Sequence, residues 1–362
     1  MIMTGLRGVG KTVLLNRFAE LAEQAGWESI ELEASKHDET AFRQSIFSKF
    51  RAALLHISPR RRWSKRARHA AEVLSSFVLS IDQSGTFSVT WDVDPSEGYG
   101  DHGDLGLDLT DVFLAVGDVA KEKETGIVLL IDEVQFLTTV QLESLIQAVH
   151  KSVQKKLPIT FVGAGLPQIA ELAGDAKSYA ERLFKFPRID SLTPEEARQA
   201  LVGPAETEKV SYDEDAVDLA VSLTHGYPYF IQELGYQAWI VASGNHITAE
   251  DISTAKEAYE AKLDGSFFRV RLDRATPLQT AYMRAMAELG SEPQKAADVA
   301  SLMKRESSQV APIRSQLIDM GLLYTPQHGY AAFTVPDFDK FMMRAVPRLE
   351  VPEIQHRRRR GK

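Results

Sequence analysis

The hydrophobic and polar positions of the first 190 residues follow two periods, one typical of strands and one typical of helices. Residues 127–131 and 159–163 are short, continuous apolar runs, which are typical of strands buried on both faces of a parallel sheet. Residues 27–34 alternate as a further strand. Helical spacing of apolar residues predicts helices over residues 13–24, 39–56, 107–122 and 139–154. Strands that alternate with helices predict an α/β fold with a parallel sheet covered on both faces.

One stretch interrupts this alternation, and we interpret residues 58–104 as an insertion in the core. It begins with a basic run, in which residues 60–68 contain six basic side chains. Residues 77–81 and 86–91 flank a glycine-containing turn and predict a hairpin, and a loop rich in glycine and aspartate follows to residue 104. The basic run fits a solvated helix face better than a nucleic-acid contact.

The pattern changes at residue 191, after which helices dominate. Residues 191–263 predict a small helical bundle, which starts with a capping box at Thr193. Residues 264–275 are expected to be a linker. Residues 276–347 predict three helices followed by a two-stranded hairpin, which is the winged-helix arrangement. The tail, residues 348–362, is basic and is expected to be disordered.

Composition narrows the class of protein. Hydrophobic residues make up 44% of the 362-residue chain and charged residues 25%, which is typical of a soluble globular protein. The chain has no cysteine, which excludes disulfides and thiolate metal sites and fits a cytoplasmic protein. No apolar run approaches the ~20 residues that cross a bilayer, so no membrane partner is expected. The net charge of −8 excludes a dedicated nucleic-acid coat, so any DNA contact must come from a local patch.

The most specific motif lies near the start of the chain. Residues 5–12 read Gly-Leu-Arg-Gly-Val-Gly-Lys-Thr, the spacing G-x-x-x-x-G-K-[ST] of a phosphate-binding loop. Residues 1–4 predict the end of a strand, and residues 13–24 predict a helix, which is the context that the loop needs. Because only four residues precede Gly5, we expect the native chain to start further upstream.

The residue types of this loop predict how it holds a nucleotide triphosphate. Backbone N–H groups of a glycine-rich loop converge on phosphate oxygens. We expect Lys11 to reach the β- and γ-phosphates and the Thr12 hydroxyl to bind Mg²⁺. The loop residues expected to contact the nucleotide are Gly5, Gly8, Val9, Gly10, Lys11, Thr12 and Val13.

A second motif, which is acidic, supports the assignment of the glycine loop. The apolar strand 127–131 ends in Asp132 and Glu133, and ligands bind at the carboxyl ends of such strands. We expect Asp132 to hold Mg²⁺ through water, and Glu133 to orient and deprotonate the attacking water. Together the two motifs predict ATP as the ligand, Mg²⁺ as the cofactor and ATP hydrolysis as the reaction.

The glycine loop, the strand Leu-Leu-Ile-Asp-Glu-Val-Gln, the helical bundle and the winged helix together resemble the AAA+ ATPases. More narrowly, they resemble bacterial and archaeal ATPases related to the replication-initiator (origin-recognition) group and to the STAND signalling ATPases. The resemblance covers nearly the whole chain except the insertion and the tail. It implies a P-loop ATPase core over residues 1–190, an α-helical lid over 191–263 and a C-terminal winged-helix domain over 276–347.

The resemblance also implies two further nucleotide contacts. Pro228, in Gly226-Tyr227-Pro228, resembles the lid proline of STAND-type ATPases, which lies beside the nucleotide; simple punctuation between two helices is the alternative. Arg182 resembles the arginine that reaches the γ-phosphate of a neighbouring subunit, which implies nucleotide-dependent self-association; an ordinary surface arginine is equally compatible.

Two departures from the AAA+ pattern predict slow hydrolysis, as in a switch rather than a motor. Residues 163–167, at the end of the strand after the catalytic glutamate, contain no polar side chain. The lid also lacks the Gly-Asp-x-Arg pattern that carries a phosphate-sensing arginine.

Three functions remain open at this point. In the first, the nucleotide state positions the winged helix on double-stranded DNA, with contacts expected from Lys304, Arg305, Ser308, Gln309, Arg314 and Ser315. In the second, a STAND-like signalling ATPase uses the winged helix to dock protein partners and binds no DNA; the acidic balance and the small set of contacts favour it. A small-molecule kinase is the third, and the helical lid, the winged helix and Glu133 argue against it.

Overall fold

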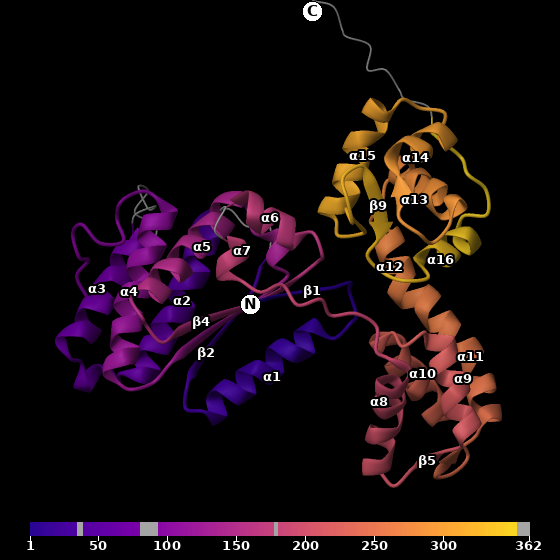
Figure 1. Cartoon of the computed structure of the whole chain (residues 1–362), viewed down its shortest axis with the longest axis horizontal. Coiled ribbons are helices and arrows are strands. Elements are labelled where there is room, and N and C mark those ends of the chain that lie inside the picture. Colours follow the sequence, from indigo (N-terminus) through magenta and orange to yellow (C-terminus); the bar gives the residue numbers. More distant parts are fainter. Residues whose placement is uncertain (35–38, 80–92, 177–179, 353–362) are drawn as a thin grey trace, which may run out of the picture. The chain divides into compact units, whose positions relative to one another are not determined.

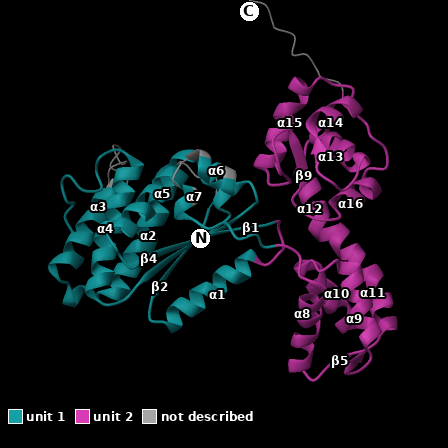
Figure 2. Ribbon diagram, viewed as in Figure 1, with its two compact units in different colours: residues 1–5, 11–189 teal, residues 6–10, 190–362 magenta. Residues whose placement is uncertain are grey.

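The computed structural model describes residues 1–34, 39–79, 93–176 and 180–352 (Figure 1). The chain divides into two compact units (Figure 2). Unit 1 comprises residues 1–5 and 11–189, and unit 2 comprises residues 6–10 and 190–362. Five residues of the glycine loop are therefore grouped with the second unit.

Unit 1 is built on a parallel sheet of four strands. The strands are β1 (Ile2–Thr4), β2 (Glu28–Glu33), β3 (Ile127–Asp132) and β4 (Ile159–Gly165), and their order in the sheet is β1-β4-β3-β2. Thr4 is in register with Gly165, and Glu33 with Asp132. The strands therefore end along one edge of the sheet, which confirms the predicted α/β class.

Different helices cover the two faces of this sheet (Figure 1). One face carries α1 (Lys11–Gln24), and the other carries α2 (Glu39–Ile57), α4 (Leu105–Glu122) and α5 (Thr139–Gln154). Successive side chains of β3 point to opposite faces of the sheet, so neighbouring residues pack against different helices. Val128 and Leu130 pack with Leu15 of α1, whereas Leu129 joins the core on the opposite face.

The apolar stripe of α1 differs in detail from the predicted one. Leu14 and Phe18 pack against the core as their spacing predicts. Val13 and Leu21, assigned to the same stripe, are 69% and 45% exposed. The buried positions of this helix are rotated toward Leu15 and Ala19, so the two outer residues of the predicted face meet solvent.

The insertion is more helical than its sequence predicts. The first strand of the expected hairpin, residues 77–81, starts inside helix α3 (Lys65–Leu79), so the expectation of a strand there is wrong for Phe77. Phe77 continues a helical stripe of buried residues, Ala67, Ala70, Val73, Leu74 and Phe77. The second strand, residues 86–91, lies outside the described residues. The basic side chains of residues 60–68 are exposed, as expected for a solvated face.

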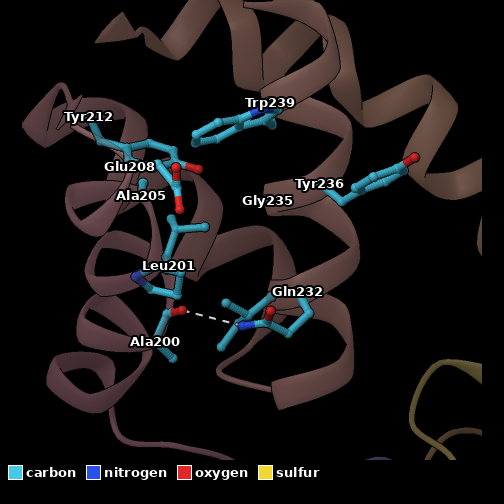
Figure 3. Close-up of a pocket in the computed structure, with 11 residues that line it drawn as sticks. Ala200, Leu201, Ala205, Glu208, Tyr212, Gln232, Gly235, Tyr236 and Trp239 are labelled. Carbon is cyan, nitrogen blue, oxygen red and sulfur yellow. Dashed lines mark hydrogen bonds between the residues drawn. The ribbon is translucent and has the colours of Figure 1, made fainter. Parts of the chain in front are cut away.

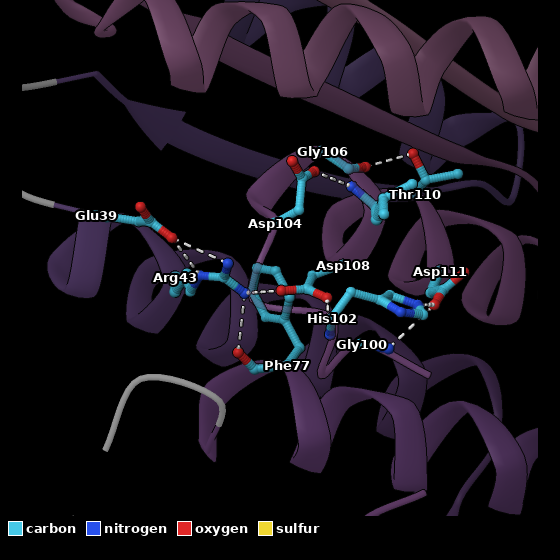
Figure 4. Close-up of polar contacts among 11 residues, drawn as sticks. Glu39, Arg43, Phe77, Gly100, His102, Asp104, Gly106, Asp108, Thr110 and Asp111 are labelled. Carbon is cyan, nitrogen blue, oxygen red and sulfur yellow. Dashed lines mark hydrogen bonds and ion pairs between the residues drawn. The ribbon is translucent and has the colours of Figure 1, made fainter. Parts of the chain in front are cut away.

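A buried ion pair fastens this insertion to the core (Figure 4). Arg43 of α2 and Asp108 of α4 lie 2.8 Å apart with side chains only 2% and 0% exposed. Arg43 also donates to the carbonyl of Phe77 at 3.4 Å. The backbone N–H of His102, in the loop before α4, donates to Asp108 at 2.7 Å. Three helices and one loop therefore share a single buried pair of charges.

The first part of unit 2 is the predicted helical bundle. Its helices are α8 (Pro194–Thr207), α9 (Glu214–Thr224), α10 (Pro228–Val241) and α11 (Ala249–Lys262). Thr193 caps α8 and Thr248 caps α11, each in a complete capping box. Two short strands, β5 (Ser211–Tyr212) and β6 (His246–Ile247), pair in parallel.

The expected linker, residues 264–275, is helical over most of its length. Helix α11 continues into a π-helical turn (Leu263–Phe268) and then into α12 (Arg269–Leu272). The reason is burial: Phe268 stacks on Phe341 with ring centroids 5.2 Å apart. A π-turn brings the apolar side chains of this segment to the core without ending the helix.

The last part of unit 2 holds three helices, a small sheet and a final helix. They are α13 (Pro277–Leu289), β7 (Gln294–Lys295), α14 (Ala296–Leu302), α15 (Ser307–Asp319), β8 (Leu323–Tyr324), β9 (Tyr330–Phe333) and α16 (Phe338–Ala345). The antiparallel sheet has the order β7-β9-β8. Within the described residues of both units, no helix combines the length and apolar character needed to cross a lipid bilayer.

Candidate functional site

The glycine loop joins β1 to α1, in the strand–loop–helix context that its sequence predicts. Gly8 and Gly10 have φ angles of +87° and +94°, a region that side chains disfavour. Gly5 is not in that region. Its N–H donates to the carbonyl of Gly165 at 3.1 Å and extends the pairing of β1 with β4.

Lys11 is folded back along the loop. The residue is 8% exposed, and its Nζ donates to the carbonyl of Gly5 at 3.0 Å. A lysine is rarely buried to this degree unless its ammonium group is bonded. The side chain therefore places a positive charge beside the start of the loop.

Two oxygen ligands from distant parts of the sequence meet beside this loop. The Thr12 hydroxyl, on the first turn of α1, donates to Asp132 Oδ2 at 2.5 Å. The other carboxylate oxygen of Asp132 accepts a hydrogen bond of 2.8 Å from the N–H of Glu133. Hydroxyl and carboxylate oxygens are ligands that suit Mg²⁺, so the two residues fit the metal that the sequence predicts.

Glu133 has an unusual backbone conformation. Its φ and ψ are 53° and 39°, in the left-handed region, which costs a residue with a side chain roughly 1–2 kcal/mol. Residues in such conformations cluster at functional sites, where the surrounding structure holds them. A short 3₁₀ turn, Val134–Phe136, follows directly. Within it, Gln135 donates its side-chain N–H to Glu133 Oε2.

Gln135 is the residue of this site that sequence reasoning missed. Its side-chain oxygen accepts a hydrogen bond of 2.9 Å from the N–H of Leu166, directly after β4. The available signal was a polar residue two positions after Glu133, the expected catalytic base, inside the motif on which the family resemblance rests. Its bond to Leu166 depends on strand pairing and leaves no pattern in the sequence.

Part of the glycine loop contacts the helical bundle within unit 2. The carbonyl of Gly8 accepts a hydrogen bond of 3.2 Å from the N–H of Tyr229. A Cβ atom on Gly8 would lie 3.2 Å from the ring of Tyr227. Pro228 stands between these two tyrosines, at the first position of α10. Burial raises the pKa of Tyr227 well above its usual range, so its hydroxyl is neutral.

Arg182 lies on α7 (Ala180–Leu183) of unit 1, and its side chain is exposed. The segment that follows runs along β1: the N–H of Ile2 donates to Lys185 at 2.8 Å, and the N–H of Ile189 donates to Thr4 at 2.7 Å. Arg182 therefore follows β4 and precedes a segment that hydrogen-bonds to β1, and its role toward a neighbouring subunit stays a prediction.

The residues expected to contact DNA divide into two groups, and the first is already engaged inside unit 2. Arg314 donates to the Thr325 hydroxyl at 3.1 Å and to the carbonyl of Tyr330 at 2.8 Å. The side-chain oxygen of Gln309 accepts a hydrogen bond of 3.0 Å from the N–H of Glu306 and so caps α15. Both side chains therefore stabilise the small domain around α15.

The second group has three exposed members, and Gln309 of the first group is exposed as well. Lys304, Ser308 and Ser315 are exposed. Arg305 is half-buried and donates to the carbonyl of Pro352. The accessible positive charge of this group is therefore concentrated at Lys304.

A separate cavity of about 380 Å³ lies between α8 and α10 of unit 2 (Figure 3). Trp239, Tyr212 and Glu208 lie near one end, and at the other end Gln232 donates to the carbonyl of Ala200 at 3.3 Å. Its lining includes none of the residues predicted to bind the nucleotide.

Comparison with known proteins adds to this geometry. Residues 1–162 match the family model of the AAA ATPase domain, and residues 265–342 match a domain of unknown function (DUF8462). No curated protein matches the chain. A Walker-type ATPase of Pyrococcus abyssi aligns with 94% of this chain and 90% of its own, at 16% identity and a TM-score of 0.58.

Two further structures align at lower scores. Cdc6p of Pyrobaculum aerophilum covers 95% of this chain and 86% of its own at 15% identity, with a TM-score of 0.44. RuvB of Thermotoga maritima covers 97% and 87% at 14% identity, with a TM-score of 0.46.

The matched domain contains both predicted motifs, at residues 5–12 and 132–133. The likeness to the Pyrococcus protein, at 16% identity, concerns the fold alone. Residues 1–162 are thus similar to the AAA ATPase domain, the chain has an α/β fold like that of the Pyrococcus ATPase, and a helical C-terminal region follows.

Proposed function

We propose that this protein binds ATP with Mg²⁺, hydrolyses it slowly, and acts as a switch whose nucleotide state positions residues 276–347, as a winged helix, on double-stranded DNA. The observation that carries nucleotide binding is the hydrogen bond of 2.5 Å between Thr12 and Asp132, beside a lysine folded over a glycine loop. The match of residues 1–162 to the AAA ATPase domain supports the same assignment. In the first turn of α10, the N–H of Tyr229 donates to the carbonyl of Gly8, and this contact supports a role for Pro228 beside the nucleotide.

Four residues carry the proposed reaction. Lys11 binds the β- and γ-phosphates and offsets their charge. Thr12 and Asp132 hold Mg²⁺, which neutralises developing charge on the phosphates when it is bound. Glu133 accepts a proton from the attacking water as the new P–O bond forms at the γ-phosphorus and the bond to the bridging oxygen breaks. The products are ADP and inorganic phosphate.

The slow rate follows from a missing charge in the lid. Residues 190–263 contain no Gly-Asp-x-Arg pattern, so this protomer lacks the phosphate-sensing arginine of that pattern. Arg182, exposed on α7, is proposed to serve a neighbouring subunit instead. Sizing the protein with and without nucleotide tests the contact between Arg182 and a neighbouring subunit.

Calorimetry and two substitutions test the proposal. Lys11→Ala is expected to abolish the binding of ATP and ADP. Glu133→Gln is expected to retain binding while hydrolysis stops, because it removes only the proton acceptor. Well-folded protein that gives no heat with either nucleotide and Mg²⁺ contradicts the whole proposal, and normal hydrolysis by Glu133→Gln contradicts the assigned base.

One observation favours a second function, in which the winged helix docks a protein partner. Gln309 and Arg314, two of the side chains best suited to reading bases, are bonded within the small domain. Mobility-shift measurements with and without ATP at two salt concentrations separate the two functions. DNA binding that weakens with salt supports the first, because phosphate contacts release counterions. Absence of binding at low salt supports the second.

A further inference from the structure

The side-chain amide of Gln135 joins two structural elements at the end of the sheet. Its oxygen accepts from the N–H of Leu166 at 2.9 Å, and its nitrogen donates to Glu133 Oε2. Leu166 follows β4, whereas Glu133 follows β3. One amide therefore connects the expected catalytic base to the neighbouring strand.

The chemistry of the two partners fixes the orientation of this amide. A backbone N–H can only donate, so the group that faces Leu166 must be the oxygen of Gln135. The NH₂ group is then directed at the carboxylate of Glu133, which accepts. A flipped amide would place two donors against each other and two acceptors against each other. The contact with Leu166 therefore determines what Glu133 receives.

Two glycines on β4 make room for this arrangement. A Cβ atom on Gly165 would lie 2.8 Å from Gln135 Oε1, closer than real Cβ atoms approach an oxygen. A Cβ atom on Gly163 would lie 2.9 Å from a methyl group of Val134. The 3₁₀ turn that carries Gln135 thus lies directly against β4, at the strand end where residues 163–167 supply no polar side chain of their own.

We infer that Gln135 is a positioning residue for Glu133: its amide supplies, from the turn after β3, the polar group that β4 lacks. This inference deepens the proposed ATPase function and rests on it. Glu133 starts from a left-handed backbone, so its carboxylate needs a second constraint to stay in one place. The amide restrains one oxygen of this carboxylate, Glu133 Oε2. Gln135 thereby substitutes for the polar residue that β4 lacks. The proposed slow hydrolysis is then attributed to the absence of the phosphate-sensing arginine pattern in residues 191–263.

Kinetics of Gln135→Ala test the inference. Loss of a group that orients a reacting side chain typically lowers activity by about 10- to 100-fold. We expect kcat to fall in that range while KM and the affinity for ADP stay within about twofold, because the phosphate contacts are untouched. Gln135→Glu, which sets a carboxylate against Glu133, is expected to lose as much or more. Unchanged kcat in Gln135→Ala overturns the inference.

A matched control separates positioning from simple stabilisation. Gln141 is another glutamine of unit 1; it is buried, whereas Gln135 is half-buried, and its side-chain oxygen accepts from the N–H of Thr138 at 3.0 Å in the cap of α5. Gln141→Ala is expected to lower thermal stability and leave kcat unchanged. Equal falls of kcat in both variants would mean that Gln135 acts through stability alone.

A readout without nucleotide tests the contact itself. In ¹⁵N-labelled protein, the side-chain NH₂ signal that disappears in Gln135→Ala belongs to Gln135. We expect that signal to shift in Glu133→Ala and to keep its position in Gln141→Ala. No shift in Glu133→Ala overturns the inference. If wild-type protein binds no ATP, the proposed function fails, and the NMR measurement still tests the contact. If wild-type protein hydrolyses ATP and Gln135→Ala does so at the same rate, the inference fails and the ATPase function stands.

Discussion

Thr12 and Asp132 lie 120 positions apart in the sequence and share a hydrogen bond of 2.5 Å between Thr12 Oγ1 and Asp132 Oδ2. One residue opens helix α1 and the other ends strand β3. The parallel sheet brings them together because its strands all end along the same edge. Two short motifs far apart in the chain therefore form one site.

Asp132→Asn tests whether this pair holds the metal. The substitution keeps the shape of the side chain and removes its charge, so we expect the gain in ATP affinity that Mg²⁺ provides to fall by about 10- to 100-fold. Binding of ATP in the presence of a chelator is expected to stay unchanged, because Lys11 is intact. Titration calorimetry with and without Mg²⁺ measures both. The control is Asp118→Asn, at an exposed position of α4; an unchanged effect of Mg²⁺ in Asp132→Asn contradicts the metal assignment.

The buried pair of Arg43 and Asp108 gives a prediction about stability. Arg43→Met leaves a fully buried carboxylate without its cation, and breaking such a pair typically costs about 3–5 kcal/mol of the free energy of unfolding. We expect the double variant Arg43→Met, Asp108→Leu to recover most of that loss, because no buried charge is left unpaired. Urea unfolding measures both.

An exposed ion pair serves as the control for this prediction. Arg17 and Glu20 lie 2.6 Å apart, but their side chains are 55% and 59% exposed. Arg17→Ala is therefore expected to change stability by less than about 1 kcal/mol. A loss in Arg43→Met as small as the loss in Arg17→Ala would show that the insertion is not fastened by its buried charges.

How far the sequence predicts this molecule depends on the range of the interactions. The strand 127–131 and the helix 139–154 are confirmed because a continuous apolar run and the helical spacing of apolar residues are local signals. The strand expected at 77–81 is wrong over residues 77–79, the described part, because Phe77 and its neighbours suit a strand by residue type, while packing against α4 decides for a helix.

The candidate site follows the same division. Thr12 and Asp132 share a hydrogen bond, and Lys11 bonds to Gly5 in the same loop; the nucleotide contacts expected of these residues stay predictions. The role of Gln135 depends on Leu166, thirty-one positions away, and on glycines that matter only once the strands are paired. The linker expected at 264–275 is helical because Phe268 has an aromatic partner, Phe341, that local sequence does not reveal.

His102 gives a prediction about pH. The hydrogen bond to Asp111 raises the pKa of His102 above its ordinary value of 6.5, and the charges of Asp111, Asp108 and Asp101 add to this shift. Because the pKa in the folded state is the higher one, the stabilisation is complete below about pH 6.5 and is lost as pH rises through the folded pKa. NMR titration of His102 is expected to show a lower pKa in Asp111→Asn. An unchanged pKa would exclude Asp111 as the cause.

Gly165→Ala tests the space that Gln135 occupies. The new Cβ atom would lie 2.8 Å from Gln135 Oε1, and the amide is the flexible end of its side chain, so the amide gives way. We expect the variant to fold, to lose its bond between Gln135 and Leu166, and to hydrolyse ATP as slowly as Gln135→Ala. Because both changes remove one interaction, the double variant is expected to be no slower than either single one.

Gly203→Ala is the matched control, since it adds the same methyl group to a helix position of α8 where nothing lies within 4 Å. That variant is expected to keep its rate and to gain up to about 1 kcal/mol in the free energy of unfolding, because alanine suits a helix better than glycine does. Steady-state hydrolysis of the four variants and of wild-type protein decides the matter. If the fold-decreases in rate of the two single variants multiply in the double variant, Gly165 and Gln135 act separately. The amide would then not be the link between β4 and Glu133.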